Sequence, residues 1–121
     1  MTVRRVKTYT AQTGFVYEYY FVGKRDALAD DPFSPATEFI FDVSSDRKTI
    51  FAVSVFLGPR ALEEYTTRHG RTLSDAEQYA AVKLRIMQAF DEITNMVQDG
   101  RRLLLDAATL PALLESIGID S

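Results

Sequence analysis

The sequence predicts an α+β fold: a four-stranded, mainly antiparallel sheet made of two hairpins, followed by two to three helices packed on one face. Apolar residues alternate with a period of two in segments up to residue 57, as in strands. From residue 60 they recur at spacings of three and four, as in helices. Gly58-Pro59 separates the two regions. Because strands and helices are segregated, an all-parallel sheet is not expected.

The first predicted hairpin joins residues 3–9 to residues 15–22 through a short loop ending at Gly14. The second joins residues 39–43 to residues 51–57 through a polar turn. The face expected to pack on the helices carries Phe15, Tyr17, Tyr19, Phe21, Phe39, Phe41, Val43, Phe51, Val53, Val55 and Leu57. Tyr20, Ile40 and Phe56 fall on the opposite face, which is then more apolar than water favours. The order of the strands stays open, because the first can lie at the edge or beside the second hairpin.

The segment Gly23–Thr37 is expected to be a loop, which is long for a compact domain. Its carboxylates Asp26, Asp30 and Asp31 are the oxygen ligands that Ca²⁺ or Mg²⁺ prefers. Their spacing matches no known metal-binding loop, so an acidic solvated loop is the favoured interpretation.

The helical half is expected to begin at the Gly58-Pro59 boundary, because Pro suits the first helical position. Arg60–Arg68 then continues a first helix that Gly70 ends. Ser74 and Glu77 form a capping box, which opens a long helix running from Asp75 to about Gln98. Residues 101–105 either extend this helix or form a short strand. Thr109 is a candidate cap for a last helix, Leu110–Ile117.

Two apolar stripes run along the predicted long helix. The first is the core stripe, with Tyr79, Val82, Ile86, Ala89, Phe90, Ile93, Met96 and Val97. The second contains Ala76, Ala80, Leu84 and Met87 and stops at Asp91. Either the preceding helix covers this second stripe or it meets another chain. The preceding helix is too short to cover it alone, so a second chain or the last helix must contribute. We expect a homodimer, with Ala80, Leu84 and Met87 as its candidate surface.

Composition bounds the possible functions. The 121 residues suit one domain, with a strand-rich half (1–57) and a helical half (58–121). The chain has no cysteine and one histidine, which excludes thiolate and His-rich metal sites, and no cofactor is expected. The net charge is −3, so no general attraction to nucleic acid exists. With no signal peptide and no apolar run of about 20 residues, a cytoplasmic protein with no membrane partner is expected.

The basic residues of the first hairpin are the best candidate for an anion or nucleic-acid contact. They lie close in sequence to Tyr9, Tyr17, Tyr19 and Tyr20, and aromatic rings flanked by cations can stack bases and hold phosphates. The set is Arg4, Arg5, Lys7, Lys24 and Arg25. Against this interpretation, such an aromatic stripe is more often a sheet face covered by helices. His69 is more simply explained by its place at a helix C-terminus than as a general base.

The sequence therefore favours a non-catalytic interaction or oligomerisation module that acts through apolar surfaces, either as a homodimer or with another protein. A small-molecule pocket or modest enzyme between sheet and helices, using Tyr and Arg, is the first alternative. Nucleic-acid binding through the basic aromatic hairpin is the second.

Overall fold

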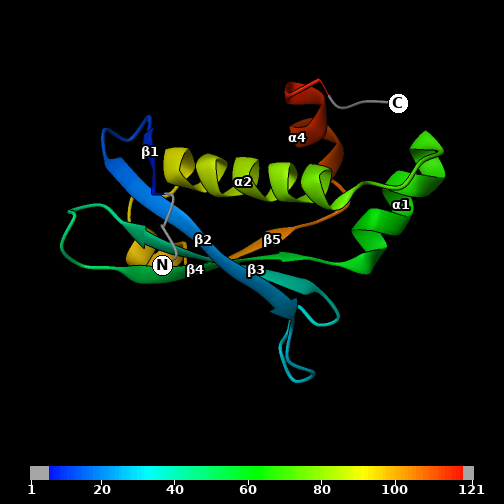
Figure 1. Cartoon of the computed structure of the whole chain (residues 1–121), viewed down its shortest axis with the longest axis horizontal. Coiled ribbons are helices and arrows are strands. Elements are labelled where there is room, and N and C mark those ends of the chain that lie inside the picture. The colour runs from blue at the N-terminus through cyan, green and yellow to red at the C-terminus, as the bar shows by residue number, and fades with distance from the viewer. Residues whose placement is uncertain (1–5, 119–121) are drawn as a thin grey trace, which may run out of the picture.

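The protein has an α+β fold, which the computed structural model describes for residues 6–118. One five-stranded sheet has the order β1-β2-β3-β4-β5 (Figure 1). Its strands are β1 (Lys7–Thr10), β2 (Val16–Asp26), β3 (Thr37–Ser44), β4 (Phe51–Leu57) and β5 (Arg102–Leu105). The helices are α1 (Pro59–His69), α2 (Asp75–Glu92), α3 (Met96–Asp99) and α4 (Leu110–Ser116).

The two predicted hairpins are confirmed, and the helical half adds a strand to them. Strands β1 to β4 pair antiparallel in chain order, which places β1 at the edge beside β2. Residues 102–105 form β5, which pairs parallel to β4 after the chain has passed through α1, α2 and α3. The expectation of four strands was therefore one short, because a parallel partner carries no local turn signal.

Strand β2 is longer than the sequence predicted. A bulge at Val22 shifts the register between Phe21 and Gly23, and pairing with β3 then continues to Asp26. A bulge absorbs one residue without ending the ladder. The expected loop from Gly23 to Thr37 is consequently only residues 27–36. The first strand was predicted over 3–9, of which residues 3–5 lie outside the described part.

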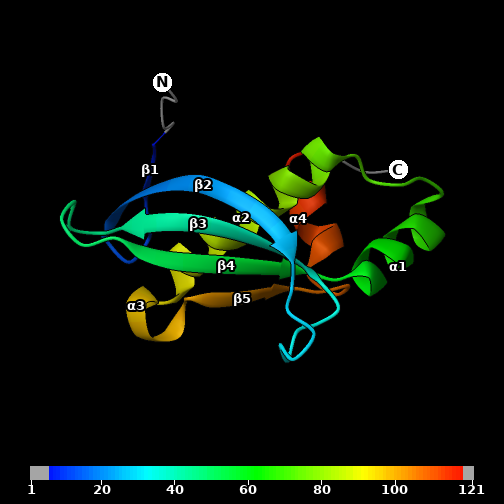
Figure 2. The same cartoon turned by 60° about the horizontal axis from the view of Figure 1, so that its bottom comes forward.

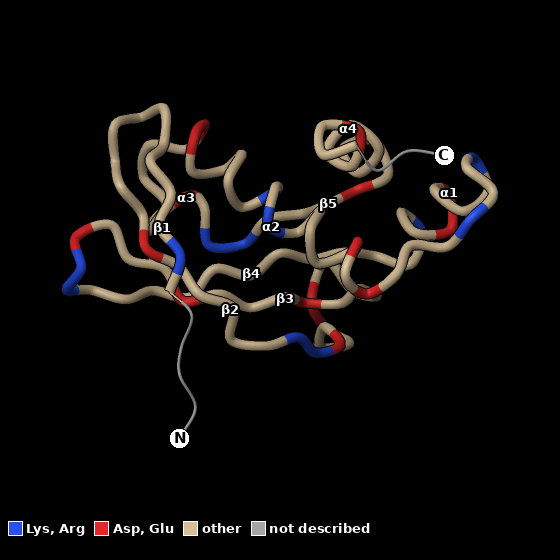
Figure 3. The backbone as a smooth tube through the Cα atoms, turned by 45° about the horizontal axis from the view of Figure 1, so that its top comes forward, with Lys and Arg blue, Asp and Glu red and all other residues tan. Residues whose placement is uncertain are grey.

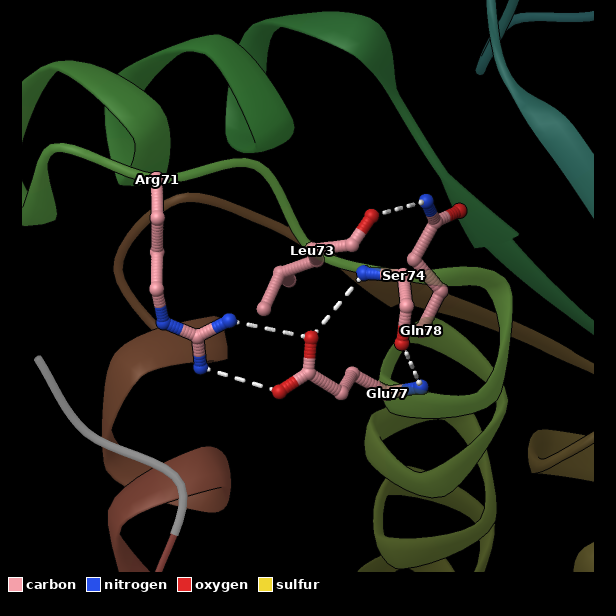
Figure 4. A network of polar contacts seen from close by, with 5 residues as sticks. All are labelled: Arg71, Leu73, Ser74, Glu77 and Gln78. Carbon is pink, nitrogen blue, oxygen red and sulfur yellow. Dashed lines mark hydrogen bonds and ion pairs between the residues drawn. The ribbon is translucent and has the colours of Figure 1, made fainter.

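The helices begin where expected, and α2 ends early. Gly70 ends α1 in the left-handed conformation, with a φ of 73°. The capping box at the start of α2 is formed as predicted: the Ser74 hydroxyl accepts from the Glu77 amide, and the Glu77 carboxylate accepts from the Ser74 amide (Figure 4). Helix α2 stops at Glu92 rather than near Gln98, because the backbone turns extended at Ile93. Asn95 then caps the short α3.

Helices α2 and α4 lie on the same face of the sheet (Figures 1 and 2). Ile86 and Phe90 of α2 are fully buried, as are Leu110 and Leu114 of α4. The Phe90 ring stacks on Tyr17 of β2 at 4.2 Å, and this contact joins α2 to the first hairpin. The predicted packed face of the sheet is confirmed apart from two departures: Phe21 is only partly buried, and Phe15, before β2, is exposed. In the predicted core stripe of the long helix, Tyr79 and Ile93 are partly buried and Val97, in α3, is exposed.

Candidate interaction surface

The second face of the sheet carries no helix of the described residues; its cover comes from a loop (Figure 2). Cross-strand pairing defines its rows: Glu18 beside Ser44, Tyr20 beside Asp42, and Ile40 beside Ser54. The final row contains Glu38 and Phe56. Loop 27–36 packs over this last row, and it emerges on the side of the sheet opposite α2 (Figure 1).

Phe33 and Arg102 hold the loop in place. The Phe33 ring lies 5.1 Å from the ring of Phe56, and the Arg102 guanidinium lies 4.9 Å from the Phe56 centroid. Arg102 also donates to Asp31 at 2.6 Å. The amide of Phe33 donates to the same carboxylate, and these two contacts hold the pKa of Asp31 below its usual value. Phe56, predicted to belong to an open apolar face, is thereby buried.

Beneath the loop, Glu38 is a buried carboxylate with two partners. Arg25 Nε donates to it at 3.0 Å and Ser54 Oγ at 2.7 Å. Burial alone raises the pKa of Glu38, but the hydrogen bonds from Ser54 and Arg25 outweigh that effect and the net shift is downward. Glu38 is therefore charged at neutral pH and is held as part of the fold.

The loop does not cover the rest of this face. We call this part the open face, and its apolar residues are Val6, Tyr20, Ile40, Ile50 and Ala52. Val6, Tyr20 and Ile50 line a shallow hollow of about 180 Å³. Polar groups border the hollow. The Tyr20 hydroxyl donates to Asp42 at 2.6 Å, and Arg47 lies 3.5 Å from Glu18. The open face thus combines apolar side chains with charges of both signs.

Sequence reasoning placed Tyr20 and Ile40 on this face and missed Val6 and Ile50. Ile50 could have been found from the sequence. It lies two residues before Ala52, and Ser54 and Phe56 follow at the same spacing, so alternation places all four side chains on one face. Ile50 is 60% exposed, against 51% for Val6.

The predicted basic set does not form one patch in the described structure. Arg4 and Arg5 lie outside the described residues. Lys7 pairs with Tyr19 near one end of β2, whereas Lys24 and Arg25 lie near the other end, about 17 Å along the strand. Lys24 and Arg25 each have an acidic neighbour, Asp75 and Glu38. Lys and Arg positions are scattered over the described backbone among Asp and Glu positions (Figure 3).

The predicted dimer stripe on α2 is half-buried at Ala80, Leu84 and Met87. The last helix, α4, packs against α2 and buries its own Leu110 and Leu114 there. This tail helix was one of the two covers that the sequence suggested for the stripe. Because α4 packs against α2, the apolar surface that this stripe offers to a second chain is smaller than the length of the stripe suggested.

The other residues considered as candidates, His69 and the loop carboxylates, make contacts within the fold. His69 lies in the last turn of α1, and its ring stacks on Tyr65 at 4.2 Å. Asp31 binds Arg102 and does not gather with Asp26 and Asp30: residues 6–118 hold no group of three or more His, Cys, Asp or Glu side chains placed to bind a metal. Within the same residues, no helix has the length and apolar character to cross a bilayer.

Comparison with known proteins adds no relative: the chain matches no protein-family model, no curated protein and no solved structure.

Proposed function

We propose that this protein is a non-catalytic interaction module that forms a homodimer through its open face. The observation that carries the proposal is a mostly antiparallel sheet with helices α2 and α4 on one face and, on the other, an exposed apolar strip that includes Ile50. Several charged side chains that would be chosen first for chemistry hold segments of the fold together instead: Arg102 with Asp31, Arg25 with Glu38, and Arg71 with Glu77.

A second copy of the chain suits the open face better than a strongly charged partner does. Two sheets can pack face to face with their apolar side chains interdigitated, and most small oligomers are two-fold symmetric. The Arg47 side chain is largely exposed and lies close to Glu18 and Asp42, so the rim of the open face offers charges of both signs to a second copy.

The area of the open face limits how tightly two copies of the chain can bind. Four strands, with about six residues along each, span roughly 20 by 20 Å, or about 400 Å². Stable complexes bury about 800 Å² on each partner. An interface this small is therefore expected to give a weak, concentration-dependent dimer that exchanges with monomer.

The stripe Ala80, Leu84 and Met87 is the second candidate interface, because its outer side chains stay half-exposed beside α4. Binding of short single-stranded DNA or RNA is not expected at physiological salt. If it occurs, its affinity should fall steeply with salt, and replacing Arg4, Arg5 and Lys7 by Ala should flatten that dependence.

A matched pair of variants tests the interface. Ile50 and Leu28 are 60% and 61% exposed, and only Ile50 lies on the open face. In sedimentation velocity over rising concentration, Ile50→Glu should remain monomeric, whereas Leu28→Glu should dimerise like the parent. Leu84→Glu combined with Met87→Glu tests the second candidate. If this double variant is monomeric while Ile50→Glu still dimerises, the interface is on α2 and the open-face proposal is wrong.

A further inference from the structure

A second hollow lies on the helix-bearing side of the sheet, away from the open face. Three segments meet around it: the start of β2, the turn between β3 and β4, and the residues that follow α2. Its volume is about 330 Å³, at the lower end of the range for small-molecule sites. The lining residues are Phe15, Tyr17, Ser45, Phe51, Thr94, Asn95, Met96 and Val97.

The lining mixes apolar side chains with the polar side chains of Ser45, Thr94 and Asn95, and none of the described residues in it carries a charge at neutral pH. Tyr17, Phe51 and Met96 are buried, and Phe15 and Val97 are exposed. Asn95 is already engaged, because its side chain accepts from the amide of Gln98 and donates to the side chain of that residue. A charged ligand therefore has no counter-charge among these residues, and an uncharged one loses least on leaving water.

Tyr17 supplies a polar group without a protein partner. Its side chain is only 1% exposed, and its ring is fixed by stacking on Phe90 at 4.2 Å with an interplanar angle of 8°. Within residues 6–118 its hydroxyl has no hydrogen bond, and burial is the only cause that raises its pKa, so it stays protonated at neutral pH. A phenylalanine would make the same stack. The hydroxyl is not fully enclosed by the described residues, so water or a ligand can accept its hydrogen bond.

We infer that this hollow binds a small uncharged ring compound whose carbonyl oxygen or ring nitrogen accepts a hydrogen bond from the Tyr17 hydroxyl. The ring of the ligand lies against Phe15, Phe51 and Val97, and Tyr17 fixes its orientation. This site differs from a pocket that uses tyrosine and arginine, because no arginine lines it.

Three probes of similar shape separate the contributions. Acetophenone has the ring and an acceptor, ethylbenzene keeps the same carbon skeleton without the acceptor oxygen, and benzoate adds a negative charge. Each is titrated into ¹⁵N-labelled full-length protein and followed by ¹H–¹⁵N correlation spectra. Acetophenone should cause saturable shifts at the amides of residues 15–17, 45 and 94–97, and benzoate should bind more weakly.

Tyr17→Phe removes only the hydroxyl oxygen. It should weaken acetophenone binding about tenfold and leave ethylbenzene binding unchanged. Tyr20→Phe, the same change on the open face, should alter neither. Without a probe, Tyr17→Phe should melt close to the parent temperature, because the hydroxyl makes no hydrogen bond with the described residues and the stack on Phe90 is kept. A folded Tyr17→Phe protein that binds acetophenone as tightly as the parent contradicts the inference, as does the absence of saturable shifts at the hollow in the parent.

The titration is repeated with Ile50→Glu, so that failure of the homodimer and failure of this site are distinguished. The hollow should bind acetophenone equally well in both backgrounds. If the amides around the hollow shift with protein concentration alone in Ile50→Glu, and acetophenone does not compete, a second copy of the chain occupies the hollow and the small-molecule inference is wrong.

Discussion

The cap of α2 offers a sharp test of how the sequence positions the main helix. Ser74 Oγ accepts from the Glu77 amide at 3.2 Å, while the Glu77 carboxylate accepts from the Ser74 amide at 3.0 Å and holds Arg71 through two further bonds (Figure 4). Ser74→Ala removes only the first of these bonds. The loss of an N-terminal cap costs about 1 kcal/mol. In a chain of this length that corresponds to a fall in melting temperature of about 3–5 °C.

Urea denaturation followed by circular dichroism measures this cost. With a slope of about 1–3 kcal/mol/M, the midpoint should fall by roughly 0.3–1 M while the slope itself stays constant. Thr72→Ala is the control, since Thr72 is exposed and lies outside the helix, and it should change stability by less than about 0.5 kcal/mol. If Ser74→Ala denatures at the parent midpoint, or if Thr72→Ala lowers stability more than Ser74→Ala does, Ser74 is not the residue that caps α2.

Three further predictions concern the core, the loop and pH. Ile86→Asp puts an unpaired charge at a fully buried site of α2 and should abolish cooperative thermal unfolding of the native state. Phe33→Ala should uncover Phe56, raise binding of a hydrophobic dye and leave the helical circular dichroism signal unchanged; a dye signal equal to the parent's would contradict the loop's role. The hydrogen bonds of Arg71 and Ser74 lower the pKa of Glu77 from 4.5 to about 2. Its stabilising effect is complete above pH 4.5 and is lost as pH falls towards 2, so Glu77→Gln should flatten stability in that window.

Local signals predicted most of the fold. The alternating aromatic residues defined the first hairpin, and the Ser74–Glu77 spacing fixed the start of α2. The end of the long helix was missed, and one further segment was left open. The helical period continues past Glu92, yet Asn95 caps a separate turn there. The sequence left residues 101–105 as helix or strand, because only pairing with β4 decides between them.

The site was less accessible to sequence reasoning. The phase of Tyr20 and Ile40 placed them correctly on the helix-free face. The cover of Phe56 depends on Arg102 meeting Asp31, which is 71 residues away, and no spacing rule connects such a pair. Likewise, the alternating pattern predicted that Tyr17 faces the helices. That its hydroxyl lies beside a hollow could not be predicted, because the hollow forms only when β2, the turn between β3 and β4, and α3 come together.

The central claim, that the chain self-associates through a weak apolar interface, is tested most directly by sedimentation equilibrium of the unmodified protein from micromolar to near-millimolar concentration. We predict that the weight-average mass rises from 13.7 kDa towards twice that value and fits a monomer–dimer equilibrium. A mass that stays at 13.7 kDa across the whole range would contradict it.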